Sequence, residues 1–202
     1  MPVHTYSFPE LRGRHGRLRA PCAGDAARLF ALFSDAGTMR WWPRAPMETL
    51  GEAAGHVDEC AAFFASGERI DWIVADPRDD AAIGTCTLYD IDPRARSAAV
   101  GYALLPAHRR RGIATDAVAQ VIAWSRRALG ITRFDASVAR GNVASIRLLE
   151  RLGFSFRCPV DAVEGTDGVE RWTLDADEAA HSWRSADSRY ALPSAYKARR
   201  AR

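Results

Sequence analysis

The stretch from residue 101 to residue 115 reads GYALLPAHRRRGIAT and places a strand end, a basic turn and a helix start in immediate succession. A helix N-terminus exposes free N–H groups and carries about half a positive charge. Gly112 lets the backbone come close to an anion, and Arg109, Arg110 and Arg111 add donors around it. The segment therefore suits a phosphate or pyrophosphate, although an arginine-rich surface turn would have the same composition.

The apolar residues on both sides of this turn predict a mixed α/β domain. The clearest helix is expected over residues 113–129, where apolar side chains form one face and Gly130 stops the helix. Further helices are expected at residues 25–34, 57–66 and 143–152, and strands at residues 17–20, 69–75, 82–90, 98–105, 132–138, 154–158 and 169–174. A strand, a helix and a strand in this order predict one crossover between parallel strands.

The chain has 202 residues, enough for one well-buried domain and short for two. Its 48% hydrophobic and 26% charged residues exclude a disordered chain, a collagen-like repeat and a coiled coil. Residues 1–16 are polar and contain Gly and Arg, which indicates a flexible N-terminal arm. Residues 17–174 hold all the expected helices and strands. Residues 175–202 are rich in Ala, Ser and Arg and are expected to form a basic C-terminal extension.

The basic residues are almost all arginines, since Lys197 is the one lysine among 28 Lys and Arg residues, and the net charge is only +3. Two clusters of them lie near the ends of the chain. Such clusters favour either solvated tails or a weak contact with ribosomal or other nucleic-acid phosphates. The clusters consist of Arg12, Arg14, Arg17 and Arg19 and of Lys197, Arg199, Arg200 and Arg202.

No apolar run has the length of a signal peptide core or the ~20 residues of a membrane-spanning helix. The four cysteines lie far apart and form no Cys-x-x-Cys pair, which indicates free thiols in a reducing compartment rather than a zinc site. We therefore expect a cytoplasmic protein with no metal ion and no membrane contact. The sequence leaves open whether it is a monomer or a homodimer.

A second motif, NVASIRLLERLGF, spans residues 142–154 and begins one short strand after the long helix. The Arg-x-x-Gly-x-Ala pattern at 109–114, followed at this spacing by Asn-x-x-Ser and a Gly-Phe helix exit, resembles the GNAT N-acetyltransferase superfamily. Within it, the RLRAP, RWWP and VGYALLP segments are similar to the RimJ/RimL-like branch, which acetylates N-terminal amines of ribosomal proteins. The resemblance covers roughly residues 17–174.

The resemblance implies a central, mostly antiparallel sheet with one splayed parallel pair, residues 98–105 and 132–138, flanked by helices. Acetyl-CoA would lie in that wedge, with no metal. Main-chain groups of Leu104 and Leu105 would hold the pantetheine arm and polarise the thioester carbonyl. Asn142 would anchor the far end of the arm, Ser145 would lie near the sulfur, and Trp41 and Trp42 would wall the acceptor pocket. The pyrophosphate would sit on the amides of Arg110, Arg111, Gly112, Ile113, Ala114 and Thr115, with added charge from Arg109 or Arg111.

The chain departs from the family pattern at both acid–base positions. Many members carry a tyrosine acid where this chain has Leu149, which leaves Ser145 as the candidate acid or as a serine bonding within its own first helical turn. The usual glutamate base is Ala99 here. Asp90 and Asp92 are then the candidate bases, unless they only stabilise the turn before the next proline.

The resemblance thus implies acetyl transfer from acetyl-CoA to a primary amine within a ternary complex. An α-amine titrates near ~7.7–8 and a lysine amine near ~10.4, so a site without a strong base suits a peptide or protein N-terminal α-amine. Two alternatives stay open. The acceptor could be a small amine such as an aminoglycoside or polyamine, or the domain could bind acetyl-CoA without catalysis.

Overall fold

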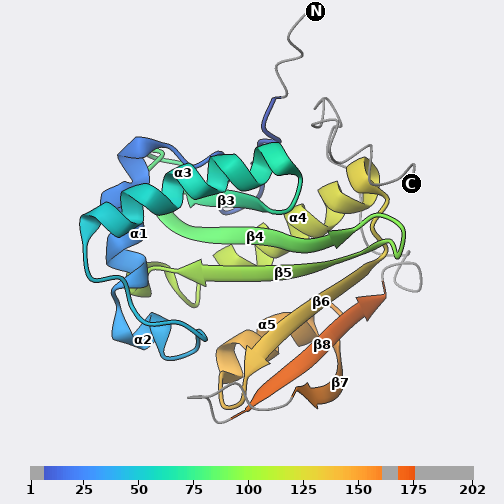
Figure 1. The fold of residues 1–202 in the computed structure, drawn as a ribbon. Coiled ribbons are helices and arrows are strands. Elements are labelled where there is room, and N and C mark those ends of the chain that lie inside the picture. Colours follow the sequence, from blue (N-terminus) through green and yellow to red (C-terminus); the bar gives the residue numbers. More distant parts are fainter. Residues whose placement is uncertain (1–6, 161–167, 176–202) are drawn as a thin grey trace, which may run out of the picture.

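The computed structural model describes residues 7–160 and 168–175, which fold around an eight-stranded sheet (Figure 1). The strand order is β1-β2-β3-β4-β5-β6-β8-β7, and every neighbouring pair is antiparallel except β5 and β6. This arrangement confirms the expected mixed α/β fold. The strands are β1 Leu11–Arg12, β2 Arg17–Arg19, β3 Ile70–Ala75, β4 Ala82–Asp92, β5 Ser97–Leu104, β6 Arg133–Ala139, β7 Ser155–Val160 and β8 Val169–Asp175.

The parallel pair opens along its length. β5 and β6 pair only from Ser97 with Arg133 to Ala99 with Asp135. Beyond that point β5 continues to Leu104 against β4, while β6 continues to Ala139 against β8. The two strands therefore splay apart as expected, and the gap between their carboxyl ends lies beside the start of the helices that follow them.

Helices cover both faces of the sheet (Figure 1). The α-helices are α1 Ala26–Phe33, α2 Ala36–Met39, α3 Leu50–Ser66, α4 Ile113–Leu129 and α5 Val143–Arg151, and 3₁₀ turns occupy Ala23–Asp25 and Pro106–His108. On one face α1 and α3 pack through Leu29, Phe33 and Val57 on strand residues such as Ile73. On the other face α4 and α5 bury Val118, Val121, Ile122 and Leu149 against Trp72 and Phe134.

The helix expected at residues 57–66 begins earlier, at Leu50. The Thr49 hydroxyl accepts the Glu52 N–H at 3.2 Å and donates to the Glu52 carboxylate at 3.0 Å, which caps the first turn. The additional turns contain Gly and Ala and bury only Ala53, so they show no apolar periodicity. A capped but weakly amphipathic start is the physical reason that the prediction was too short.

The prediction of a flexible arm over residues 1–16 is wrong for residues 7–16, which the structure describes. Residues 11–12 form β1 against β2, and the buried Leu11 joins the core. The Pro9 carbonyl accepts the Trp72 indole N–H at 2.6 Å, and the Asp116 carboxylate at the start of α4 accepts the His15 N–H at 2.9 Å. The packed domain therefore begins before residue 17.

The N-terminal basic cluster is partly neutralised within the chain. Arg19 makes a two-pronged ion pair with Asp25, at 2.7 and 2.8 Å, and Arg17 pairs with Asp80 at 2.7 Å. These contacts reduce the charge that this cluster could offer to a nucleic acid. The expected C-terminal extension was residues 175–202, but Asp175 ends β8 and so belongs to the sheet. The second cluster and residues 176–202 lie outside the described residues. Among the described helices, none is both long and apolar enough to cross a membrane.

Candidate active site

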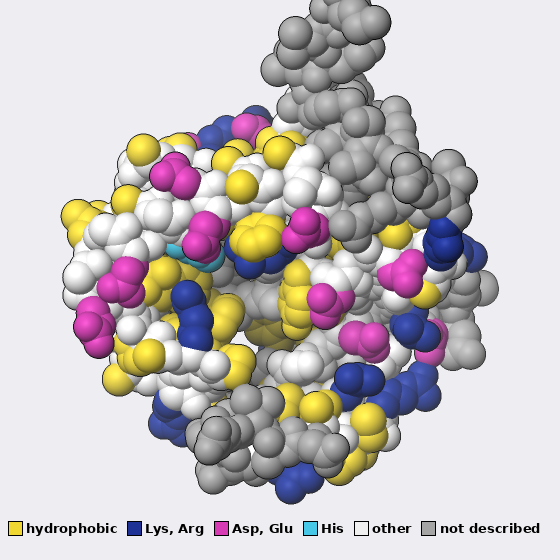
Figure 2. Space-filling view, viewed as in Figure 1, with side chains coloured by type: hydrophobic (Ala, Val, Ile, Leu, Met, Phe, Trp, Pro, Cys, Tyr) yellow, Lys and Arg dark blue, Asp and Glu magenta, His cyan; other side chains and the backbone are white. Residues whose placement is uncertain are grey.

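A cavity of about 1310 Å³ opens on the α1 and α3 face of the sheet and reaches the gap between β5 and β6. Its walls come from α1, the segment after α2, α3, strands β3 to β6 and the start of α5. Figure 2 shows it as a hollow with hydrophobic and basic side chains along its wall and acidic side chains around its rim. The cavity therefore gives a second molecule access to the splayed strands.

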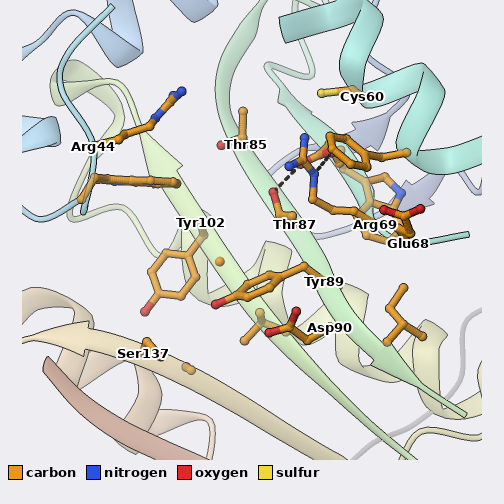
Figure 3. Close-up of a pocket in the computed structure, with 18 of the residues that line it drawn as sticks. Arg44, Cys60, Glu68, Arg69, Thr85, Thr87, Tyr89, Asp90, Tyr102 and Ser137 are labelled. Atoms are coloured by element: carbon orange, nitrogen blue, oxygen red, sulfur yellow. Dashed lines mark hydrogen bonds and ion pairs between the residues drawn. The ribbon is translucent and has the colours of Figure 1, made fainter. Parts of the chain in front are cut away.

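A pair of hydroxyl groups bridges the gap between β5 and α5. The Tyr102 phenol on β5 lies 2.7 Å from the Ser145 hydroxyl on α5, and either atom can donate. The Asn142 side chain accepts the Ser145 N–H at 3.2 Å and so caps α5. The Ser145 hydroxyl is thus turned toward Tyr102 rather than bonded within its own helical turn. Figure 3 shows the Tyr102 hydroxyl pointing toward the β6 side of the cavity.

The surroundings of the Tyr102–Ser145 pair keep the Tyr102 phenol protonated. Burial raises the pKa of Tyr102 to about 12, and the hydrogen bond with Ser145 offsets only part of that effect. Leu149, one helical turn after Ser145, is fully buried in the hydrophobic core. Tyr102 is therefore a protonated phenol beside Ser145, and the sequence alone had given it no role.

The two candidate bases differ in what they contact. Asp92 accepts the backbone N–H groups of Arg94 at 2.8 Å and Ala95 at 3.0 Å, and these bonds lower the pKa of Asp92 and hold the turn. Asp90 lines the cavity, has φ of 49° at the irregular end of β4, and lies beside Tyr89 in Figure 3. Asp92 thus has the turn role, whereas Asp90 stays available as a base.

Position 99, where the usual glutamate is missing, lies on the middle one of three neighbouring strands. Ala99 on β5 is paired with Tyr89 on β4 and with Asp135 on β6. The Asp135 carboxylate accepts the Thr173 hydroxyl at 2.6 Å. No carboxylate occupies position 99, and the one beside it on β6 is already bonded across the sheet.

The basic turn leads into α4 as predicted, with Gly112 at the N-cap. Arg110 and Gly112 have φ values of 61° and 77°, and residues 110–112 are exposed. A Cβ placed on Gly112 would meet nothing nearer than the His15 ring at 3.5 Å, so the approach to the helix start is open. Ile113 is buried, whereas Ala114 and Thr115 are half-buried in the first turn.

Arg109 has a different environment from its two neighbours. Its guanidinium donates to the Leu104 carbonyl at 3.0 Å and to the Thr38 hydroxyl at 2.6 Å, and it lies 3.5 Å from Asp35. These contacts join the end of β5 to α2. Two of the three guanidinium nitrogens of Arg109 thus bond within the protein, whereas the side chain as a whole stays partly exposed.

The main-chain groups expected to hold the pantetheine are partly engaged. The Leu105 N–H donates to the Ile83 carbonyl on β4 at 3.0 Å, and the Leu104 carbonyl accepts from Arg109. Of the groups expected to contact the thioester carbonyl, the Leu104 N–H is the one for which the prediction stays open. The end of β5 is thus fixed on one side by β4 and on the other by Arg109.

The two adjacent tryptophans line the cavity in different ways. Trp42 packs edge-on against Phe33 with ring centroids 5.7 Å apart and belongs to the α1–α3 core. Trp41 stacks under Arg40, whose Cζ lies 4.1 Å from the ring centroid, and reaches across to Gly141. Trp42 therefore supports the cavity wall, and Trp41 narrows the space between that wall and the start of α5.

The inner wall next to α3 is polar and largely satisfied. Asp71 accepts from Arg69 at 2.6 Å and from the Thr87 hydroxyl at 2.8 Å. Burial raises the pKa of the Cys60 thiol to about 12, so this thiol stays protonated and is a poor nucleophile. Burial also lowers the pKa of His56 on the same helix. Nothing in this wall favours a covalent acetyl-cysteine step.

Comparison with known proteins gives consistent results. Residues 17–155 match the sequence profile of the acetyltransferase (GNAT) domain. The Bacillus subtilis N-acetyltransferase YoaA is 31% identical over 147 residues, which is 73% of this chain and 83% of that protein.

Two solved structures illustrate the similarity of the fold. RimJ of Mycobacterium smegmatis in complex with CoA-disulfide superposes with a TM-score of 0.74 at 22% identity, over 84% of this chain and 87% of that one. Spermidine N-acetyltransferase of Vibrio cholerae in complex with CoA and spermine gives a TM-score of 0.70 at 22% identity, over 81% and 97%.

Proposed function

Because the chain belongs to the GNAT acetyltransferase family and is an N-acetyltransferase, we propose that it moves an acetyl group from acetyl-CoA to the α-amine of a peptide or protein N-terminus. The observation that carries this proposal is the Tyr102–Ser145 hydroxyl pair, which lies where the open cavity meets the splayed strands. Transfer is direct, within a ternary complex, since the buried Cys60 thiol is a poor nucleophile.

The residues present fit acetyl-CoA, which supplies the acetyl thioester. The backbone N–H groups at the start of α4 would hold the pyrophosphate. Gly112 leaves the approach to these groups open, and a side chain at this position would fill that space. Arg110 and Arg111 are exposed and would add charge. The Leu104 N–H would orient the thioester carbonyl, and the Asn142 amide nitrogen would bind the pantetheine while its oxygen caps α5.

The catalytic groups then act in a defined order. The neutral amine forms the N–C bond as the C–S bond breaks, and Ser145 gives its proton to the departing sulfur while it receives the Tyr102 proton. Solvent returns a proton to Tyr102. Asp90, directly or through water, takes the proton that the amine nitrogen releases. Trp41 and Trp42 narrow the cavity and limit how the acceptor enters.

The absence of a carboxylate at position 99 supports the choice of acceptor. An α-amine with a pKa near ~7.7–8 is often neutral at physiological pH, whereas a lysine amine near ~10.4 is not. The structural similarity to RimJ supports the RimJ/RimL-like branch. The similarity to a spermidine N-acetyltransferase favours a second candidate, a polyamine acceptor.

Thiol release from acetyl-CoA, measured with N-terminal peptides, aminoglycosides and polyamines, tests the proposal. We expect turnover with peptides to exceed turnover with the small amines. A thermal melt comes first, because ligand at ~100 times its dissociation constant adds about 2.7 kcal/mol of stability. A shift with acetyl-CoA and no acceptor that raises thiol release would indicate a binding module instead.

A further inference from the structure

We propose that Arg44 is an anion-binding subsite of the acceptor cavity, and that the acceptor is a peptide with an Asp or Glu among its first residues after the α-amine. This inference rests on the proposed function, because it names the class of peptide that the same site takes. It follows from the placement of one guanidinium and from how the carboxylates of the cavity are used.

Arg44 lies on the cavity wall in a stacked position. Its Cζ is 4.7 Å from the centroid of the Phe33 ring and 5.9 Å from the centroid of the Trp42 ring. A guanidinium stacked by its face keeps the N–H groups on its edge for a planar acceptor such as a carboxylate. Within residues 7–160 and 168–175, Arg44 has no ion pair or hydrogen bond. Its edge donors therefore face the cavity unused (Figure 3).

The surroundings of Arg44 favour an incoming anion. Burial is the main cause that lowers the pKa of Arg44, and the like charge of Arg69 lowers it further, while Glu59 and Glu52 offset part of this. Glu59 stands on the rim with a side chain that is 66% exposed, so its charge is well screened. Arg44 is itself exposed, so a bound carboxylate would form an ion pair that solvent partly screens, and it would also reduce the repulsion from Arg69.

Among the described residues, no carboxylate of the cavity forms an ion pair with Arg44. Asp71 is committed to Arg69 and to the Thr87 hydroxyl, and Asp92 holds its own turn. Asp90 lines the cavity from the β4 end, beside Tyr89, while Arg44 enters from the α1 side (Figure 3). An acceptor with an amine at one end and a carboxylate at the other matches this separation of charge, whereas a polycation would place an ammonium beside Arg44.

The test compares three tetrapeptides, Ser-Glu-Ala-Ala, Ser-Gln-Ala-Ala and Ser-Lys-Ala-Ala, with amidated C-termini so that only the second residue changes the charge. For the natural chain we expect kcat/KM to be about fivefold higher for the Glu peptide than for the Gln peptide, as for an ion pair that is partly exposed to solvent. The Lys peptide should be the poorest of the three. The amidated ends remove the C-terminal carboxylate as a second source of the anion.

Two variants locate the effect. Arg44→Gln removes the charge and keeps a polar side chain, and it should bring the Glu peptide to within about twofold of the Gln peptide. Arg28→Gln is the matched control, since Arg28 is exposed on α1 outside the cavity lining, and it should keep the full preference. A melt with acetyl-CoA checks that both variants fold and bind the donor.

The outcomes separate the two proposals. Equal turnover of all three peptides, or a preference for the Lys peptide, overturns the anion subsite and leaves the proposed function in place. A Glu preference that survives in Arg44→Gln also overturns it. Failure of every peptide while spermidine is acetylated overturns the proposed acceptor, and the inference with it.

Discussion

Replacement of Tyr102 by Phe removes one oxygen from the hydroxyl pair and leaves the ring in place. If Tyr102 only positions Ser145, the loss is that of one neutral hydrogen bond, about 0.5–1.5 kcal/mol, or roughly 2- to 13-fold in rate. If Tyr102 supplies the proton that Ser145 passes on, the loss belongs to general acid catalysis, which contributes about 10²- to 10⁴-fold. The 2.7 Å contact is short enough for proton transfer and favours the second case. The phenol pKa of about 12 means that Tyr102 still carries its proton at neutral pH.

We therefore predict that Tyr102→Phe lowers kcat about 100-fold and changes the KM for acetyl-CoA less than threefold. Ser145→Ala should have a similar effect, and the double variant should be no worse than the poorer single variant, because both groups act in one relay. The assay is steady-state thiol release at saturating peptide. Tyr89→Phe, a cavity tyrosine with no hydrogen bond among the described residues, is the control and should retain activity within threefold.

A different pattern would refute the relay. If Tyr102→Phe lost less than about tenfold while Ser145→Ala lost 100-fold or more, Tyr102 would be a positioning group only. If the two losses multiplied in the double variant, the two hydroxyl groups would act independently. Thermal melts of each variant exclude loss of the fold as the cause.

Three further predictions concern pH, donor binding and stability. With a peptide α-amine acceptor, kcat/KM should rise with pH to about 9, because the amine loses its proton near ~7.7–8. It should then stay level to about pH 10, because Tyr102 keeps its proton until about 12, and a fall between pH 9 and 10 would contradict this. Gly112→Ala forces an L-residue to φ of 77° and should raise the KM for acetyl-CoA roughly tenfold, with kcat unchanged; an unchanged KM would remove the helix start from the donor site. Asp25→Ala should cost about 2 kcal/mol in denaturant unfolding, because it removes both bonds that Arg19 makes to its buried partner, while the ion pair of Arg19 with Asp80 remains. Burial alone would raise the pKa of Asp25, but the bonds from Arg19 lower it overall, so this contribution is present above about pH 4 and is lost as the pH falls further.

Most elements of the fold could be predicted because their signals are local. The helix Ile113–Leu129 matches the prediction at both ends, since a strong apolar face lies between two glycines with positive φ. β1 was missed because a two-residue strand has no periodicity and exists only through its pairing with β2. α2, with four residues, was missed for the same reason, and its cap from Asp35 to Thr38 forms over three residues only.

The site was predictable as a set of segments but not as a set of contacts. The basic turn, Asn142 and Ser145 lie where the two motifs place them. The bond from Arg109 to Thr38 spans 71 residues and the bond from Tyr102 to Ser145 spans 43, so no window of sequence contains either. Asp92 differs from Asp90 because the backbone N–H groups of the turn donate to the Asp92 carboxylate, and the backbone geometry of the turn decides this.

The central claim, acetylation of an N-terminal α-amine, is tested most directly by locating the acetyl group. A peptide with a free N-terminal serine, a following glutamate and one internal lysine is incubated with the protein and acetyl-CoA, and the product is fragmented in a mass spectrometer. We predict that the acetyl group is found on the serine α-amine and that the lysine stays free. An acetyl group on the lysine, or an unmodified peptide under conditions in which spermidine is acetylated, would contradict the account.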